Sequence, residues 1–280
     1  MTALVGSMNA NAAGTIDLFT APTGTTTVQD SALGPGSDFF GNPLTTFLES
    51  NDADAPGSIL GGFRDMEVAF ISKTSTASST AAISMTVDSG VLSIDTDTGV
   101  IGKGTLQWDG DDGLASLDTT TGLGGIDFLT LGDGFNFEII SADLTFDFSI
   151  GLYDGSGNSV VFDLAANTGA HDGNIAFSFF SNAFSDGVCG AGIVPGFLDD
   201  GFDAPNGDHI NSVSCGGTPG AFNIQDINAM EVVFNTNGGV VDVDLSIGAI
   251  TAVPEPSSLA LIGLGLMATG FASKRKSKKA

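Results

Sequence analysis

A period-two alternation of large apolar and polar residues recurs along this chain, and it limits the fold to one built from β-strands. Between residues 144 and 152 every even position is Leu, Phe or Ile, whereas the odd positions are Thr, Asp, Ser and Gly. Because successive side chains of a strand point to opposite faces of its sheet, this pattern predicts a strand with one buried and one solvated face. The turn-forming residues at 154–158 then lead into a second apolar run at 160–164, which predicts a hairpin.

Similar runs elsewhere in the chain are predicted as further strands. They lie at 83–87 and 92–94 with a turn at 88–90, at 135–139, at 175–179 and, as the last two strands, at 230–234 and 241–247. Glycine makes up 40 of the 280 residues and Asp outnumbers Glu by 28 to 5, a composition that favours frequent turns over helices. We therefore predict an all-β fold, an antiparallel β-sandwich or jelly roll over residues 14–252. A β-solenoid is the alternative, but no period holds across three successive units.

The charge is divided unevenly along the chain. Five of the eight basic residues lie after residue 273, so that residues 1–253 hold 3 basic and 32 acidic residues, a net charge of −29. A body this acidic repels phosphate backbones and offers no basic stripe, which argues against nucleic-acid binding. The same charge suits cations and a hydrated, saline environment.

The C-terminal segment consists of three physically different pieces. Pro254, Glu255 and Pro256 precede an apolar run at 259–272, which is followed by a basic cluster. As a helix the run is about 21 Å long, so we predict one short transmembrane helix whose reach Lys and Arg stems extend. The predicted anchor residues are Leu259, Leu261, Ile262, Leu264 and Leu266, and the predicted basic stop is Lys274, Arg275 and Lys276. The basic cluster favours the cytoplasmic side, which leaves the acidic body outside. The alternative is a C-terminal core helix with a solvated tail.

This tripartite end, residues 253–280, resembles the PEP-CTERM sorting domain, a segment that is also labelled the ice-binding protein C-terminal domain. The resemblance implies export, transient anchoring in the inner membrane and recognition by an exosortase. It also implies cleavage near the Pro-Glu-Pro element and release to the cell surface or to an exopolysaccharide matrix.

Two further features fit an exported protein. Residues 1–13 contain Ala10, Asn11 and Ala12, which match an A-x-A cleavage site, so we interpret this segment as the remnant of a signal peptide rather than as a frayed terminus. Cys189 and Cys215 form an even pair within a stretch rich in Gly, Pro and Asp. In an oxidising compartment such a pair predicts a disulfide, with two free thiols as the alternative.

No catalytic motif is complete, and we predict that the protein is not an enzyme. There is no G-x-S-x-G element, and the two histidines lie in unrelated contexts. Clustered Asp residues suit calcium, and the densest cluster contains Asp109, Asp111 and Asp112. Because no cluster completes an EF-hand loop, solvated Asp-Gly turns are the favoured interpretation, and no metal site or cofactor is assigned. The lone Trp108 is predicted to lie in the core rather than to form a platform for a sugar ring.

Together these features favour an exported structural protein of the cell surface or extracellular matrix that associates with exopolysaccharide. A carbohydrate-binding adhesin is the first alternative. A secreted hydrolase is the second, because a catalytic pair of carboxylates leaves no spacing signature in a sequence.

Overall fold

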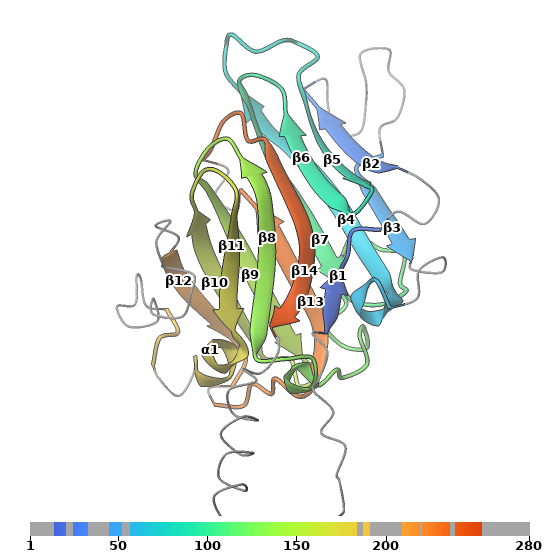
Figure 1. The fold of residues 1–280 in the computed structure, drawn as a ribbon, viewed down its shortest axis with the longest axis vertical. Coiled ribbons are helices and arrows are strands. Elements are labelled where there is room, and N and C mark those ends of the chain that lie inside the picture. The colour runs from blue at the N-terminus through green and yellow to red at the C-terminus, as the bar shows by residue number, and fades with distance from the viewer. Residues whose placement is uncertain are drawn as a thin grey trace, which may run out of the picture.

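The computed structural model describes residues 14–20, 25–32, 45–51, 57–183, 187–190, 209–218, 220–235 and 239–253. Within these ranges fourteen strands form two seven-stranded sheets that pack face to face, and every strand pairing is antiparallel (Figure 1). The structure is thus nearly all β, a two-sheet sandwich.

The first sheet has the strand order β11-β8-β14-β6-β5-β2, and β1 pairs with β14 beside it. Its strands are β1 (Thr15–Asp17), β2 (Thr26–Ser31), β5 (Ala82–Asp88), β6 (Val91–Thr96), β8 (Gly134–Ala142), β11 (His171–Ala176) and β14 (Leu245–Val253). The second sheet has the order β12-β10-β9-β13-β7-β4-β3. Its strands are β3 (Phe47–Asn51), β4 (Phe63–Lys73), β7 (Val100–Trp108), β9 (Phe146–Asp154), β10 (Ser159–Ala166), β12 (His209–Gly216) and β13 (Ile227–Phe234). Three short helices complete the described elements: η1 (Leu60–Gly62), η2 (Phe128–Thr130) and α1 (Phe177–Asn182).

The hairpins expected from the alternating pattern are present. β9 and β10 pair in register, and the even residues of β9 are buried between the sheets, as the pattern requires. The strand begins at Phe146 rather than at Leu144, which is exposed. β5 and β6 form the second predicted hairpin.

The last two strands differ in part from the prediction. They are β13 and β14, as expected, but they lie in different sheets, and β14 begins at Leu245 rather than at residue 241. Asn235 and Asp242 both have a positive φ, a turn conformation that Asn and Asp tolerate and that a strand excludes. Because β13 and β14 belong to different sheets, they do not form a hairpin.

The predicted strand at 175–179 is wrong in its second half. β11 ends at Ala176, and Phe177–Asn182 form the helix α1. Phe177 and Phe180 are both fully buried, and their spacing of three suits one face of a helix. Their rings pack against Phe135, Phe128 and Phe162 in an aromatic cluster with edge-to-face geometry. Burial of two large rings on one helical face thus outweighed the apparent alternation.

Two glycines of β7 allow the sheets to approach closely. A Cβ at Gly102 would lie 2.9 Å from Cβ of Ile83, and one at Gly104 would lie 2.6 Å from the terminal methyl of Met85. Both contacts come from β5 in the opposite sheet. The centre of the sandwich is therefore packed directly between β5 and β7.

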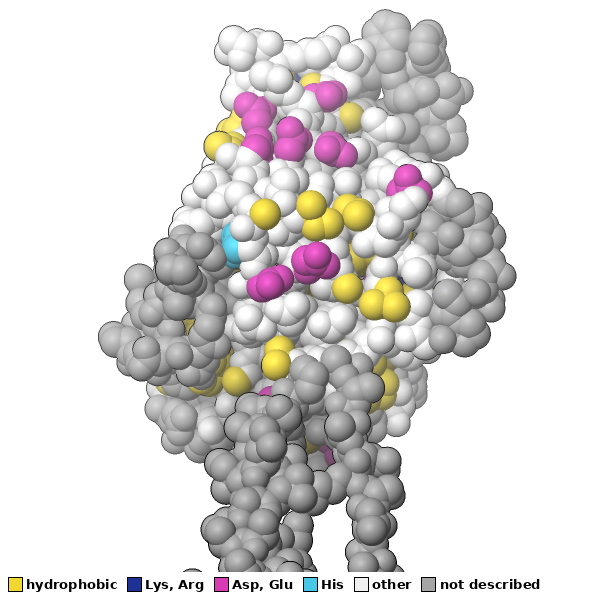
Figure 2. Space-filling model, in the orientation of Figure 1, with side chains coloured by type: hydrophobic (Ala, Val, Ile, Leu, Met, Phe, Trp, Pro, Cys, Tyr) yellow, Lys and Arg dark blue, Asp and Glu magenta, His cyan; other side chains and the backbone are white. Residues whose placement is uncertain are grey.

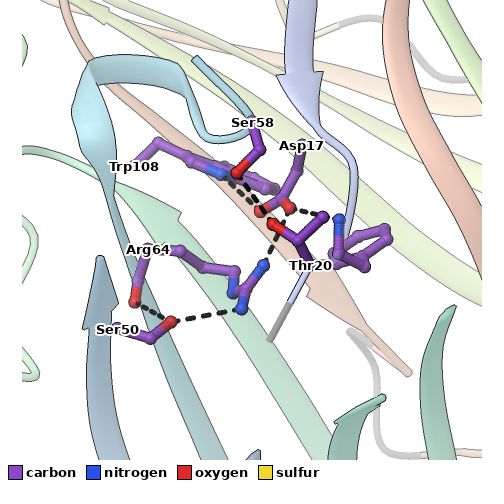
Figure 3. Close-up of polar contacts among 7 residues, drawn as sticks. Asp17, Thr20, Ser50, Ser58, Arg64 and Trp108 are labelled. Atoms are coloured by element: carbon purple, nitrogen blue, oxygen red, sulfur yellow. Dashed lines mark hydrogen bonds and ion pairs between the residues drawn. The ribbon is translucent and has the colours of Figure 1, made fainter. Parts of the chain in front are cut away.

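A buried ion pair connects the two sheets (Figure 3). Nη1 of Arg64 on β4 donates to Oδ1 of Asp17 on β1 at 2.8 Å, and both side chains are fully buried. Nε1 of Trp108 donates to the other Asp17 oxygen at 3.1 Å, and the N–H of Phe19 donates to Oδ1 at 2.7 Å. Burial raises the pKa of Asp17, whereas the guanidinium of Arg64 and these N–H donors lower it. Trp108 is a core residue, as predicted, and is not available as a sugar platform.

The predicted signal-peptide remnant at 1–13 and the predicted membrane anchor at 259–272 lie outside the described residues. Among the residues that are described, none belongs to a helix that is long and apolar enough to span a membrane.

Candidate functional site

The predicted disulfide is confirmed. Cys189 and Cys215 are bonded, with 2.06 Å between the sulfurs and 5.4 Å between the Cα atoms. Cys215 lies on β12, an edge strand of the second sheet, so the bond ties residues 187–190 to that edge. The backbone supports the same contact, because the N–H of Gly190 donates to the carbonyl of Val213 at 2.7 Å.

A cluster of acidic side chains lies on the outer face of the second sheet. Glu49 on β3 is paired directly with Asp65 on β4, and Asp65 is paired on its other side with Gln107 of β7. Because Arg64 points between the sheets, its neighbour Asp65 points to the opposite, outer face. The chain leaves β7 at Trp108, so Asp109 and Asp112 on the following loop fall beside Asp65.

The oxygens of this cluster lie within ligand distance of one another. One carboxylate oxygen from each of Glu49, Asp65 and Asp112 lies within 4.8 Å of the others. Oε2 of Glu49 accepts hydrogen bonds from the N–H of Asp112 at 3.1 Å and of Gly113 at 2.9 Å. These two bonds fasten the loop to β3, and they orient the Glu49 carboxylate toward the loop.

The loop after β7 is held by hydrogen bonds of its own. Asp118 accepts from the hydroxyl and N–H groups of Thr120 and Thr121, and these bonds lower the pKa of Asp118 below its usual range. The N–H of Asp118 in turn donates to Oδ2 of Asp109 at 2.7 Å. A Cβ at Gly122 would lie 2.8 Å from the carbonyl oxygen of Asp109, so the loop closes on itself where only glycine fits. The acids on this loop therefore have fixed positions.

The carboxyl groups of the cluster lie close together, and burial and mutual repulsion shift their pKa values. Asp65 is only 2% exposed, and neither of its oxygens meets an N–H or O–H donor in the described part of the chain. Burial, together with the charges of Asp109, Glu49 and Asp112, raises the pKa of Asp65 to about 8. Burial also raises the pKa of Asp109 to about 6. A proton on Asp65 allows a hydrogen bond between the two carboxyl groups, so the pair is suited to hold a proton or a cation.

The sequence identified half of this cluster. Asp109 and Asp112 lie in it, whereas Asp111 is exposed and is not among the residues whose oxygens come together. Glu49 and Asp65 were not predicted. They come together because the register of β3 and β4 sets them opposite each other, and no local sequence pattern reveals that register.

The remaining predicted site residues lie outside the described part of the chain. These are Pro254, Glu255 and Pro256 of the sorting element, Leu259, Leu261, Ile262, Leu264 and Leu266 of the anchor, and Lys274, Arg275 and Lys276 of the basic stop.

Comparisons with known proteins bear on the C-terminal segment. No curated protein sequence matches the chain. A solved structure described as "Structure of PfGH50B" is similar over 68% of this chain at 11% identity, with a TM-score of 0.39, and this chain spans 22% of its length. A family model described as the PEP-CTERM protein-sorting motif matches residues 252–276, which confirms the resemblance based on the Pro-Glu-Pro element. The chain therefore carries the sorting motif of exported proteins that an exosortase recognises, which implies a membrane-anchored precursor that is processed to the cell surface.

Proposed function

We propose that the mature protein is a structural component of the cell surface or extracellular matrix, without enzymatic activity, and that it associates with exopolysaccharide. The observation that carries this proposal is the sorting motif at 252–276. Its first two residues are also the last two of β14, so the motif begins within the folded sandwich. Cleavage near Pro254 would thus release the sandwich with its sheets intact.

The surface charge supports a location in a hydrated matrix. Residues 1–253 carry 32 acidic and 3 basic residues, and Figure 2 shows acidic side chains at several places on the face of the first sheet. A surface of one sign hydrates strongly and resists self-association. The disulfide at the edge of the second sheet adds stability that suits an oxidising location outside the cytoplasm.

Sorting is tested by the mass of the protein that reaches the surface. We expect the full chain, expressed in a host with an exosortase, to appear at the surface without the residues that follow the Pro-Glu-Pro element. Glu255→Ala should leave most of the protein as the unprocessed precursor, and Glu138→Ala, an exposed acid on β8, is the matched control that should be processed normally. A surface-released native protein that still extends to Ala280 would contradict the sorting proposal.

Association with exopolysaccharide is tested separately. The fraction of processed protein that sediments with the matrix should be several-fold higher in a polysaccharide-producing host than in an isogenic strain that makes none. Equal retention in the two strains would refute the association with exopolysaccharide, and it would not affect the sorting proposal. Release of reducing ends from the purified polysaccharide by the protein would instead favour the hydrolase alternative.

A further inference from the structure

The acidic cluster on the outer face of the second sheet contains charge that the described part of the fold does not neutralise. Four carboxyl groups gather there, from Glu49, Asp65, Asp109 and Asp112. The ion pair that Arg64 forms lies on the other face of β4 and engages Asp17. Lys73 donates to a backbone carbonyl at the far end of the same strand. The charge of Lys103, the third described cation, acts on Glu67, where it opposes the burial that raises the pKa of that residue. No Lys or Arg side chain of the described residues is therefore in an ion pair with the cluster.

Asp65 is the residue that points to a ligand. A carboxyl group that is removed from water is stable there only if it is protonated, paired with a basic side chain or bound to a metal cation, because burial of an unpaired carboxylate is strongly unfavourable. Asp65 is 98% removed from solvent, both its oxygens lack donors within the described residues, and one oxygen lies within 4.8 Å of oxygens from Glu49 and Asp112. Oδ1 of Asp109, also buried, lacks a donor as well. The carboxyl group of Asp65, which meets no donor, thus lies beside the carboxylates of Glu49 and Asp112.

The chemistry of the donor set selects the cation. All the available ligands are oxygens, which hard cations prefer and which zinc or copper sites seldom use alone. The ligands come from two strands and an irregular loop, and calcium accepts such a set because it binds six to eight oxygens in flexible geometry. Magnesium requires a nearly octahedral shell at short distances and gives up its water reluctantly, so it fits this site less well.

We propose that Glu49, Asp65 and Asp112 bind one calcium ion, with Asp109 adding negative charge beside it, and that the ion fastens the loop after β7 to strands β3 and β4. The N–H groups of Asp112 and Gly113 already hold Oε2 of Glu49 at the loop, and a carboxylate has about four lone-pair sites in all, so the Glu49 carboxylate can also bind a cation. Extracellular calcium modules bind with dissociation constants of about 0.1–1 mM, which is the range expected for an exported protein.

The single tryptophan provides a direct readout. Trp108 is the residue before Asp109, so its fluorescence reports unfolding of the strand that carries the loop. With the full chain in a mild non-ionic detergent and after treatment with a chelator, calcium chloride at about ten times the dissociation constant should raise Tm by roughly 3–6 °C. Magnesium chloride and sodium chloride at matched ionic strength should raise it far less.

Two variants separate binding from a general effect on folding. Asp65→Asn should abolish the calcium-dependent shift and leave the Tm of the metal-free protein nearly unchanged, because the raised pKa keeps Asp65 largely uncharged there at neutral pH and Asn has nearly the same shape. A variant that was only misfolded would have a lower Tm in the absence of calcium as well. Asp111→Asn removes an exposed acid of the same loop and should keep the full shift. If Asp65→Asn does not fold, Glu49→Gln serves in its place.

Calorimetric titration with calcium chloride completes the test. One ion per chain in the unmodified protein, and at least a tenfold weaker dissociation constant in Asp65→Asn or Glu49→Gln, would support the site. An equal Tm shift with magnesium, a shift that persists in Asp65→Asn, or no binding at millimolar calcium would overturn it.

Discussion

Removal of Arg64 from the buried ion pair should destabilise the protein more than removal of an exposed cation. In Arg64→Met the stem of the side chain is retained, whereas the charge opposite Asp17 is lost. Asp17 would stay fully buried with donors only from Phe19 and Trp108. Removal of one member of a buried pair typically costs about 3–5 kcal/mol, because the other charge is left uncompensated.

The expected size follows from this value. For a chain of this length each kcal/mol lowers Tm by about 2–4 °C, so Arg64→Met should lower Tm by roughly 6–20 °C. The contact of the Arg64 guanidinium with the Phe19 ring, 5.6 Å from the ring centroid, is lost as well and adds to the effect. The double variant Asp17→Asn/Arg64→Met should recover much of the loss, because an uncharged Asn keeps an oxygen for the same donors.

Urea unfolding measures these differences. Trp108 fluorescence and far-UV circular dichroism should give coincident transitions if unfolding is two-state. Lys73→Met, which removes an exposed cation from the same strand, should change the free energy of unfolding by less than about 0.5 kcal/mol. A loss below about 1 kcal/mol in Arg64→Met, or a double variant no more stable than the single one, would refute the assignment of the ion pair as a link between the sheets.

Two further predictions concern the second sheet. Reduction of the Cys189–Cys215 bond, which closes a loop with a sequence separation of 26, should lower the free energy of unfolding by roughly 3–4 kcal/mol. Alkylation of both cysteines in the unreduced, folded protein would contradict the bond. Burial and the neighbouring Glu231 raise the pKa of Tyr153 from 10.0 to about 12, so its contribution to stability is complete below pH 10 and is lost as the pH rises through 12. Tyr153 is the only tyrosine, so absorbance at 295 nm should titrate near pH 12 in the native protein and near 10 in urea; equal midpoints would rule the shift out.

The β-hairpins could be predicted because their information is local. In β9 and β10 the alternation and the intervening turn lie within one short stretch, and the pairing in the structure follows from them. The assignment of strands to the two sheets could not be predicted in this way. β13 and β14 have similar alternation and follow one another in the sequence, yet they lie in different sheets, and the positive φ of Asn235 and Asp242 between them is not evident from the alternation.

The acidic cluster could likewise be predicted only in part from local sequence patterns. Asp109 and Asp112 are visible in the sequence as a dense acidic loop, but a dense acidic loop is usually a solvated turn. This loop differs from a solvated turn because Asp65, more than forty residues earlier in the sequence, and Glu49 on the neighbouring strand lie beside it. That proximity depends on the order β3-β4-β7 in the second sheet, which follows from tertiary structure and not from a local motif.

The two charged networks also specify the register of β4. Arg64 and Asp65 are adjacent, so they point to opposite faces of the strand: Arg64 meets Asp17 between the sheets, and Asp65 meets Glu49 and the loop outside. A slip of one residue would place Asp65 against the buried Asp17 and Arg64 on the outer face, and it would also move the apolar residues of β4 out of the core. Two like charges buried together are strongly unfavourable, so this alternative is excluded by charge as well as by hydrophobicity. A calcium ion bound at Asp65 would reinforce the same register from the outer face, since its ligands come from β3, β4 and the loop only when Glu49 and Asp65 are paired.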